Sequence, residues 1–255
     1  MRTHFQAVQD QFDPQARAYL TSAVHAAGPD LAAARELAAR HLPAAAAVLD
    51  AGTGAGHLSF TLAPLAGRVV ALDPAAGMLA TVRAAAVERG LAQIETCEAG
   101  AAALPFAAAS FDLVCTRYSA HHWFDVPRAL AEMRRVVKPD GFILVIDLLG
   151  DAHPLVDTHL QSIELLRDTS HVRDRSESEW HVLLREAGCG AIEHRSWMTR
   201  LEFGPWVQRM RTPEALCTAI RMLQSGAAAE VQRALNIEAD GSFTARTGLF
   251  WGRAT

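Results

Sequence analysis

The chain has 255 residues, half of them hydrophobic and a fifth charged, a globular composition that excludes intrinsic disorder. Its formal net charge of −4 gives no general attraction to phosphate backbones or anionic membranes, so we expect no nucleic-acid partner. The four scattered cysteines form no CxxC pair, so we expect reduced thiols and a cytoplasmic location. No apolar run approaches the ~18 residues of a membrane span, so we expect no stable membrane insertion.

Short apolar runs in the middle of the chain predict strands, and helical patterns separate them. The runs cover residues 46–50, 68–73, 93–98, 111–116 and 142–147. Most lack period-2 alternation, which is typical of strands buried on both faces. Helices are predicted at 75–89, closed by Gly90, and at 127–137, followed by a turn sequence at 138–141. This alternation of strands and helices predicts right-handed crossovers and a parallel sheet.

The ends of the chain have a different pattern. The first 40 residues are mostly helical and contain no obvious strand. Ser176 and Glu179 fit a capping box for a helix that we expect to end at Gly188. Two late strands are predicted at 191–197 and 242–251, and the stretch between them predicts helices with breaks near Pro213 and Gly226. We expect that helical stretch to cover the carboxyl edge of the sheet.

A glycine-rich turn, Asp50-Ala51-Gly52-Thr53-Gly54-Ala55-Gly56, follows the first predicted strand. Glycine lets a ligand approach the backbone closely, and ligands of open parallel sheets bind beyond the carboxyl ends of the strands. The dinucleotide pattern G-x-G-x-x-G fits neither register, because its last position falls on His57 or Ser59. Asp50 suits a cationic ammonium group, and Asp73, at the end of the next strand, can accept hydrogen bonds from ribose hydroxyls. Together they favour a nucleoside with an amino-acid tail.

These residues resemble the motifs of class I S-adenosylmethionine-dependent methyltransferases of the type-11 domain family. The matching segments are residues 48–56, 72–79, 104–106, 110–114 and 134–142. Segments 12–16, 19–25, 117–123 and 166–173 are similar to ubiquinone/menaquinone C-methyltransferase-like proteins. The resemblance implies an α/β, Rossmann-like fold with a seven-stranded, mostly parallel sheet and helices on both faces. It also implies S-adenosyl-L-methionine as the cofactor.

The resemblance further implies one methyltransferase domain over residues 1–255. Within it we expect a helical lid at 1–40, a cofactor-binding core at 41–150, and substrate-cover helices with the last two strands at 151–255. Asp50, Gly52 and Gly54 are expected to hold the amino-acid tail, and Asp73 the ribose. The other expected cofactor-binding residues are Ala51, Pro74, Met78, Ala101, Arg117 and Tyr19.

One departure from the family concerns adenine. Family members often have an acid before Leu-Pro-Phe that binds the adenine amino group, whereas this chain has glycine and alanines at 100–103. We therefore expect adenine to be held by the backbone near Ala101 and by packing on Met78, with a weaker affinity.

Residues 117–123 follow the fourth predicted strand and so lie at the ligand-binding edge. His121 or His122 is a candidate base near neutral pH, and Tyr118 is a further candidate catalytic residue that can shape the pocket. Adjacent histidines point in different directions, so at most one is expected to face the substrate. A histidine pair without a third ligand nearby predicts no metal site.

The predicted function is methyl transfer from S-adenosylmethionine to a carbon, oxygen or nitrogen atom of a small-molecule metabolite, by a monomer or homodimer. One alternative is a non-catalytic S-adenosylmethionine-binding protein. Another is a nicotinamide-dependent reductase, against which the glycine spacing and the lack of a Tyr-x-x-x-Lys pair argue.

Overall fold

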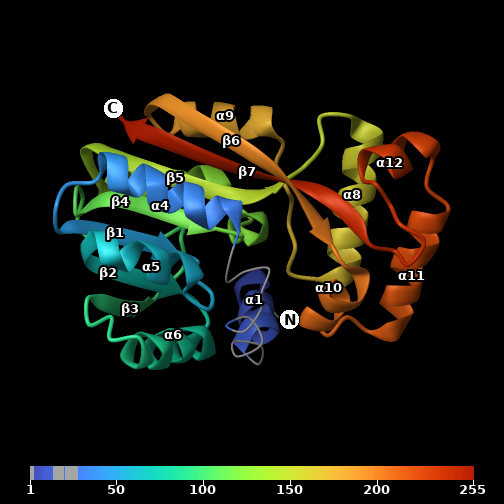
Figure 1. Ribbon diagram of the computed structural model, residues 1–255, viewed down its shortest axis with the longest axis horizontal. Coiled ribbons are helices and arrows are strands. Elements are labelled where there is room, and N and C mark those ends of the chain that lie inside the picture. Colours follow the sequence, from blue (N-terminus) through green and yellow to red (C-terminus); the bar gives the residue numbers. More distant parts are fainter. Residues whose placement is uncertain (1–2, 14–19, 21–27) are drawn as a thin grey trace.

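The computed structural model describes residues 3–13, 20 and 28–255, so Tyr19 lies outside the described residues. The described chain forms a seven-stranded sheet in the order β3-β2-β1-β4-β5-β7-β6 (Figure 1). The strands are β1 Ala46–Ala51, β2 Ala66–Asp73, β3 Ile94–Glu98, β4 Phe111–Arg117, β5 Val137–Leu149, β6 Cys189–Leu201 and β7 Phe243–Ala254. The first five pair in parallel, and β7 runs antiparallel to both of its neighbours. The predicted fold class is confirmed.

Helices cover both faces of the sheet, which explains why the central strands β1 and β4 are buried on both faces. The flanking helices are α4 Pro29–His41, α5 His57–Leu62, α6 Ala76–Glu88, α7 Val126–Val136 and α9 Glu177–Glu186. On β1, Val48 packs with α4 and α5, whereas its neighbour Leu49 packs with α7 and α9. Because successive side chains of a strand point to opposite faces, both must be apolar to be buried. Figure 1 shows α4 and α9 on opposite sides of the sheet.

A further group of helices packs beyond the ends of β6 and β7 (Figure 1). It comprises α8 Pro154–Arg167, α10 Phe203–Arg209, α11 Glu214–Ser225 and α12 Ala229–Ala234. They share a separate apolar cluster around Trp206, which also includes Phe243 at the start of β7. A substrate-cover role for these helices remains a prediction. None of the helices in the described chain is both long and apolar enough to cross a membrane.

Helix α1, His4–Phe12, lies between this group and the sheet (Figure 1). The side-chain amide of Gln9 donates to the Pro74 carbonyl oxygen at 2.8 Å, and that of Gln11 donates to the Met210 carbonyl oxygen at 3.0 Å. The helix therefore joins the loop after β2 to the segment that follows α10.

The structure refines several predicted boundaries. The turn predicted at 138–141 lies inside β5, where Asp140 has a φ of 62° and the pairing register with β4 shifts. The capping box at Ser176 is present in full. Strand β6 extends beyond the predicted 191–197 in both directions. It is an edge strand in which polar and apolar side chains are mixed, so the apolar pattern marks only part of it.

Candidate active site

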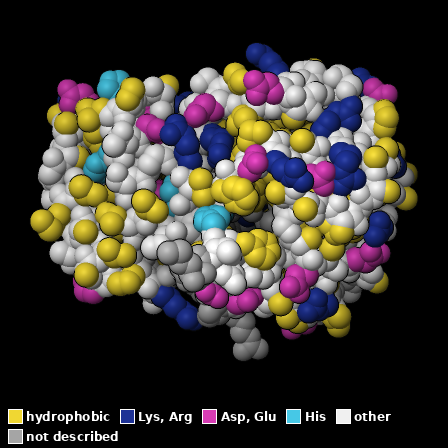
Figure 2. All heavy atoms as spheres, turned by 180° about the vertical axis from the view of Figure 1, so that it is seen from behind, with side chains coloured by type: hydrophobic (Ala, Val, Ile, Leu, Met, Phe, Trp, Pro, Cys, Tyr) yellow, Lys and Arg dark blue, Asp and Glu magenta, His cyan; other side chains and the backbone are white. Residues whose placement is uncertain are grey.

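A cavity of about 170 Å³ opens where β1, β2 and β4 end, and helix α1 forms one of its walls. The predicted site residues that line it are Asp50, Gly52, Gly54, Asp73, Pro74, Met78, Ala101, Arg117, Tyr118 and His122. Ala51 and His121 are not among the lining residues. The face shown in Figure 2 is hollowed near its middle, and hydrophobic and histidine side chains gather at the rim.

The first two glycines of the turn serve different purposes. Gly52 has a φ of 74°, and a Cβ atom there would lie 2.0 Å from the Ser119 hydroxyl oxygen. Gly54 has a φ of 52°, and a Cβ atom there would meet no described atom within 4 Å. Gly52 thus allows the ends of β1 and β4 to pack closely, whereas Gly54 leaves space beside the backbone for a ligand.

Asp50 is buried at the floor of the cavity, with 1 % of its surface exposed. Its Oδ2 accepts hydrogen bonds from the hydroxyls of Thr53 and Ser59, each at 2.7 Å, and from the Ser59 amide at 3.1 Å. Its Oδ1 is buried and accepts none from any described residue. Burial raises the pKa of Asp50, although these hydrogen bonds oppose the shift. The free oxygen of this carboxylate is therefore suited to a cationic donor.

Asp73, at the end of β2, lines the same cavity. Its Oδ2 accepts from the Gly54 amide and its Oδ1 from the Ala75 amide, both at 2.9 Å. Burial raises the pKa of Asp73 to about 6, the two amides lower it, and the nearby charge of Asp50 raises it further. Two carboxylates that repel each other give the cavity a negative potential, which favours a positively charged ligand.

The two adjacent histidines have separate environments. His122 lines the cavity, and its Nδ1 lies 3.1 Å from the carbonyl oxygen of Ser170. A carbonyl oxygen can only accept, and the Ser170 hydroxyl, 3.2 Å from the same nitrogen, donates to Asp168, so Nδ1 carries the proton and Nε2 keeps its lone pair. Burial, followed by the charge of His121, lowers the pKa of His122 to about 4, so the ring is neutral at pH 7. This arrangement provides a proton acceptor at the cavity wall.

The comparisons with known proteins agree with this geometry. A family model described as a methyltransferase domain matches residues 49–145. The uncharacterized methyltransferase YcgJ of Bacillus subtilis (strain 168) is 32 % identical over 205 residues, which cover 79 % of each chain. The chain belongs to the methyltransferase family.

The crystal structure of YcgJ and two further relatives are also similar to this methyltransferase. The crystal structure of YcgJ superposes with a TM-score of 0.82 at 28 % identity, covering 88 % of this chain and 98 % of that one. The uncharacterized protein YafE of Escherichia coli (strain K12) is 45 % identical over 193 residues, covering 76 % of this chain and 93 % of YafE. The ubiquinone/menaquinone biosynthesis C-methyltransferase UbiE of Hahella chejuensis is 37 % identical over 117 residues, covering 44 % and 47 % of the two chains.

The other two candidate catalytic residues of the methyltransferase, His121 and Tyr118, contact side chains elsewhere in the fold. The Nδ1 of His121 lies 2.6 Å from Asp147 Oδ1, outside the cavity lining. The Tyr118 hydroxyl lies 3.3 Å from the Thr247 hydroxyl, and burial raises the pKa of Tyr118 to about 12. A phenol with so high a pKa stays protonated at neutral pH. His122 therefore has the geometry of a base, and Tyr118 that of a wall residue.

Arg117 lines the cavity of the methyltransferase and forms a buried ion pair with Asp30 of α4, with Nε and Oδ2 2.5 Å apart. Its guanidinium also lies 4.6 Å from the centre of the Tyr118 ring. A buried carboxylate and an aromatic face thus fix this arginine in place. A direct role of Arg117 in cofactor binding remains a prediction.

The sequence predicted a helical lid over residues 1–40, but not which side chains of α1 line the cavity. His4, Phe5, Val8 and Phe12 all line it. The spacing of Phe5, Val8 and Phe12 places an apolar stripe on one helical face, and this signal could have found them. The ring of Phe5 lies against Gly100, where a Cβ atom would approach it to 3.3 Å. A helix side chain thus packs beside the position where the family often carries an acid.

The two glycines can be separated by experiment. We expect Gly54→Ala to fold with a loss of about 1–2 kcal/mol from its positive φ, and to bind ligand weakly because its methyl group enters the cavity. Gly52→Ala is expected to lose more stability, about 2–5 kcal/mol, because its methyl group overlaps the Ser119 hydroxyl. Thermal denaturation and ligand titration measure both effects.

Gly204 is the matched control, because an added Cβ there meets no described atom within 4 Å and its φ is not positive. Gly204→Ala should leave ligand affinity unchanged. Equal stability of the Gly52 and Gly54 variants would contradict the assigned roles.

Proposed function

We propose that this methyltransferase transfers the methyl group of S-adenosylmethionine to a small molecule, with His122 as the proton acceptor. The observation that carries the proposal is the buried Oδ1 of Asp50, which has no hydrogen-bond partner among the described residues and lines the same cavity as Gly54. An ammonium group next to a ribose would satisfy both Asp50 and Asp73, because each carboxylate retains lone pairs for additional donors.

The described residues fit three parts of the cofactor: the amino group, the ribose and adenine. Asp50 is suited to the α-amino group and Asp73 to the ribose hydroxyls, while Met78 and Ala101 line the wall on which adenine would pack. Burial raises the pKa of both carboxylates, and repulsion from Asp50 raises the pKa of Asp73 further. A cation relieves that repulsion, which supports a positively charged cofactor over a dinucleotide phosphate.

When bound, the cofactor supplies an electrophilic methyl group on a sulfonium centre. The protein must align a nucleophile with it and accept any proton that the nucleophile loses. The Ser170 carbonyl holds the His122 ring in the tautomer with a free Nε2. Phe12 packs against this ring edge-to-face at 5.0 Å, which further fixes its orientation.

Part of the cavity wall is aromatic. Phe5 and Phe124 are 47 % and 73 % exposed, and Trp123 donates from its indole nitrogen to the Ser119 hydroxyl at 3.2 Å. All three line the cavity. Exposed aromatic surface at a cavity favours a ligand with an apolar or aromatic body. UbiE, a ubiquinone/menaquinone C-methyltransferase, is a relative whose name is consistent with this class of substrate.

Calorimetric titration with S-adenosylmethionine, S-adenosylhomocysteine and NADH tests the cofactor, and methyl-transfer assays over a panel of small molecules test the substrate. We expect micromolar binding of both sulfur nucleosides and none of NADH. Binding of NADH alone would support a nicotinamide-dependent reductase. Tight binding of the sulfur nucleosides without turnover of any candidate would favour a non-catalytic binding protein.

His122→Gln is expected to lower kcat about 100-fold and to leave the affinity for S-adenosylmethionine within a factor of three. Glutamine keeps a donor for the Ser170 carbonyl but cannot accept a proton. The lowered pKa of His122, about 4, means that the wild-type base stays available down to about pH 5, and we expect kcat to fall at lower pH. If the kcat of the His122→Gln variant is unchanged, His122 is not the proton acceptor.

A further inference from the structure

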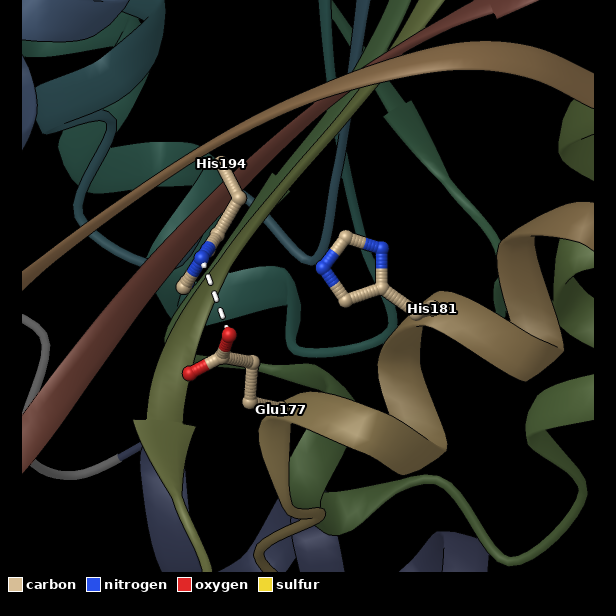
Figure 3. A group of neighbouring side chains, drawn as sticks. All are labelled: Glu177, His181 and His194. Atoms are coloured by element: carbon tan, nitrogen blue, oxygen red, sulfur yellow. Dashed lines mark ion pairs between the residues drawn. The ribbon is translucent and has the colours of Figure 1, made fainter.

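Three potential metal ligands lie together on the face of the sheet that α9 covers. They are Glu177 and His181 of α9 and His194 of β6, and one ligand atom from each lies within 4.8 Å of the others. The Nδ1 of His194 is 3.3 Å from Glu177 Oε1. Figure 3 shows a ring nitrogen of His181 pointing toward the other two side chains. None of the three lines the cavity described above.

Local geometry explains why these side chains converge. Glu177 and His181 are four residues apart on α9, so they share one helical face. His194 pairs directly with Phe250 of β7, and the two rings stack with centroids 4.6 Å apart. His181 meets the same Phe250 ring edge-to-face at 5.4 Å. One fully buried aromatic ring therefore orients both imidazoles.

We propose that Glu177, His181 and His194 form a Zn²⁺ site with a water molecule in the fourth position. Two imidazole nitrogens and one carboxylate oxygen are a ligand set of zinc, whereas Mg²⁺ and Ca²⁺ prefer oxygen ligands alone. Ligand atoms of tetrahedral zinc lie ~3.3 Å apart, so small side-chain rotations close the present group around the ion. The site links α9 to the edge strand β6 and thereby stabilises this end of the sheet.

Two features limit the affinity. The outward nitrogens, His181 Nδ1 and His194 Nε2, are buried without a hydrogen-bond partner among the described residues. Zinc-bound histidines normally donate that N–H to an acceptor, and its loss weakens binding about 10–100-fold. Arg246 also lies 3.5 Å from Glu177 Oε2 and competes for the carboxylate. We therefore expect a micromolar Kd for the single site.

The test uses the full chain without a histidine tag, treated with chelator and titrated with Zn²⁺ by calorimetry. We expect one equivalent to bind, and zinc at 100 times its Kd to raise Tm by about 5–10 °C. His181→Gln and His194→Gln should each weaken binding at least 100-fold and abolish the Tm shift. Titration with Mg²⁺ should give no heat of binding at this site.

His41→Gln is the matched control, since His41 also stacks on an aromatic ring, that of Trp251, but belongs to none of the described metal-ligand groups. It should bind zinc like the wild type. A second group, His121, Asp147 and Asp174, is the competing location. Zinc binding that is absent from the wild type, or that persists in both the His181 and the His194 variants, would overturn the proposal.

Discussion

Asp50→Asn is expected to raise the Kd for S-adenosylmethionine about 100-fold while the protein stays folded. A hydrogen bond to a charged group contributes about 1.5–3 kcal/mol, and the variant loses the charge that faces the ammonium group. The asparagine oxygen can still accept from Thr53 and Ser59, which leaves its amide donors toward the cavity. The two N–H groups of the asparagine amide then face the ammonium group, so the loss of binding free energy should lie near the upper end of the range of about 1.5–3 kcal/mol.

Calorimetry with two ligands isolates the contribution of the amino-acid tail. Methylthioadenosine has the nucleoside but no tail, so Asp50→Asn should leave its affinity almost unchanged. Burial raises the pKa of Asp50, which means that the empty fold disfavours the charged form. We therefore expect the variant to have a Tm at pH 7 no lower than that of the wild type. Equal losses of affinity for both ligands would contradict the assignment of Asp50 to the ammonium group.

His121→Gln is expected to lower the free energy of unfolding by about 3–5 kcal/mol and Tm by about 6–20 °C. His121 is paired with Asp147, whose side chain is only 1 % exposed, so the substitution leaves a buried carboxylate without its cation. The backbone amides of His121 and Leu148 still donate to Asp147, but neither carries a charge. The effect should therefore fall on folding rather than on methyl transfer.

The dependence on pH identifies the ion pair as the cause. Burial alone lowers the pKa of His121, but the charge and hydrogen bond of Asp147, with the charges of Asp174 and Glu164, raise it to about 9. A base with a raised folded pKa contributes stability that is complete below its unfolded pKa of about 6.5 and is lost as the pH rises through about 9. The Tm difference between wild type and variant should thus shrink between pH 7 and pH 10.

Thermal denaturation of both proteins across that pH range makes the comparison. Replacing the exposed His153 by Gln is the control and should cost only about 1 kcal/mol, because the structural role of that side chain is to accept a hydrogen bond from the Leu155 amide at the start of α8. Adding Asp147→Asn to His121→Gln should recover much of the loss, because the orphaned charge is then removed as well. A constant Tm difference at every pH would mean that the ion pair is not the cause.

Much of the fold could be predicted from the sequence because the central parallel strands β1 and β4 are buried on both faces. Leu49 and Val114, with Val48 and Leu113 on the opposite side, all have 0 % exposure. The start of β5 could not be placed, since residues 138–141 have a turn composition and pair only through a shifted register. Edge strand β6 was predicted only in part, because polar and apolar residues are mixed along it.

The candidate site was predictable where one local segment makes it, as in the glycine turn after β1. The different positions of His121 and His122 could not be predicted, because each ring is oriented by a partner that is distant in sequence. The His121 ring contacts Asp147 outside the cavity lining, whereas the His122 ring contacts the Ser170 carbonyl at the cavity wall. The same is true of Arg117, whose partner Asp30 is 87 residues away. Pairings at such separations are decided by tertiary packing, which a sequence pattern does not record.

The position of β7 between β5 and β6 affects how the protein is made. Strand β6 pairs with β7, which follows only after residues 202–242 have been synthesised. On the ribosome, β6 therefore emerges without its neighbour, and the backbone edge of β5 stays open during the same interval. Unpaired edges of this kind associate with other chains. The yield of soluble protein during expression should therefore depend on how fast this last part of the chain is translated, even for variants whose finished fold is fully stable.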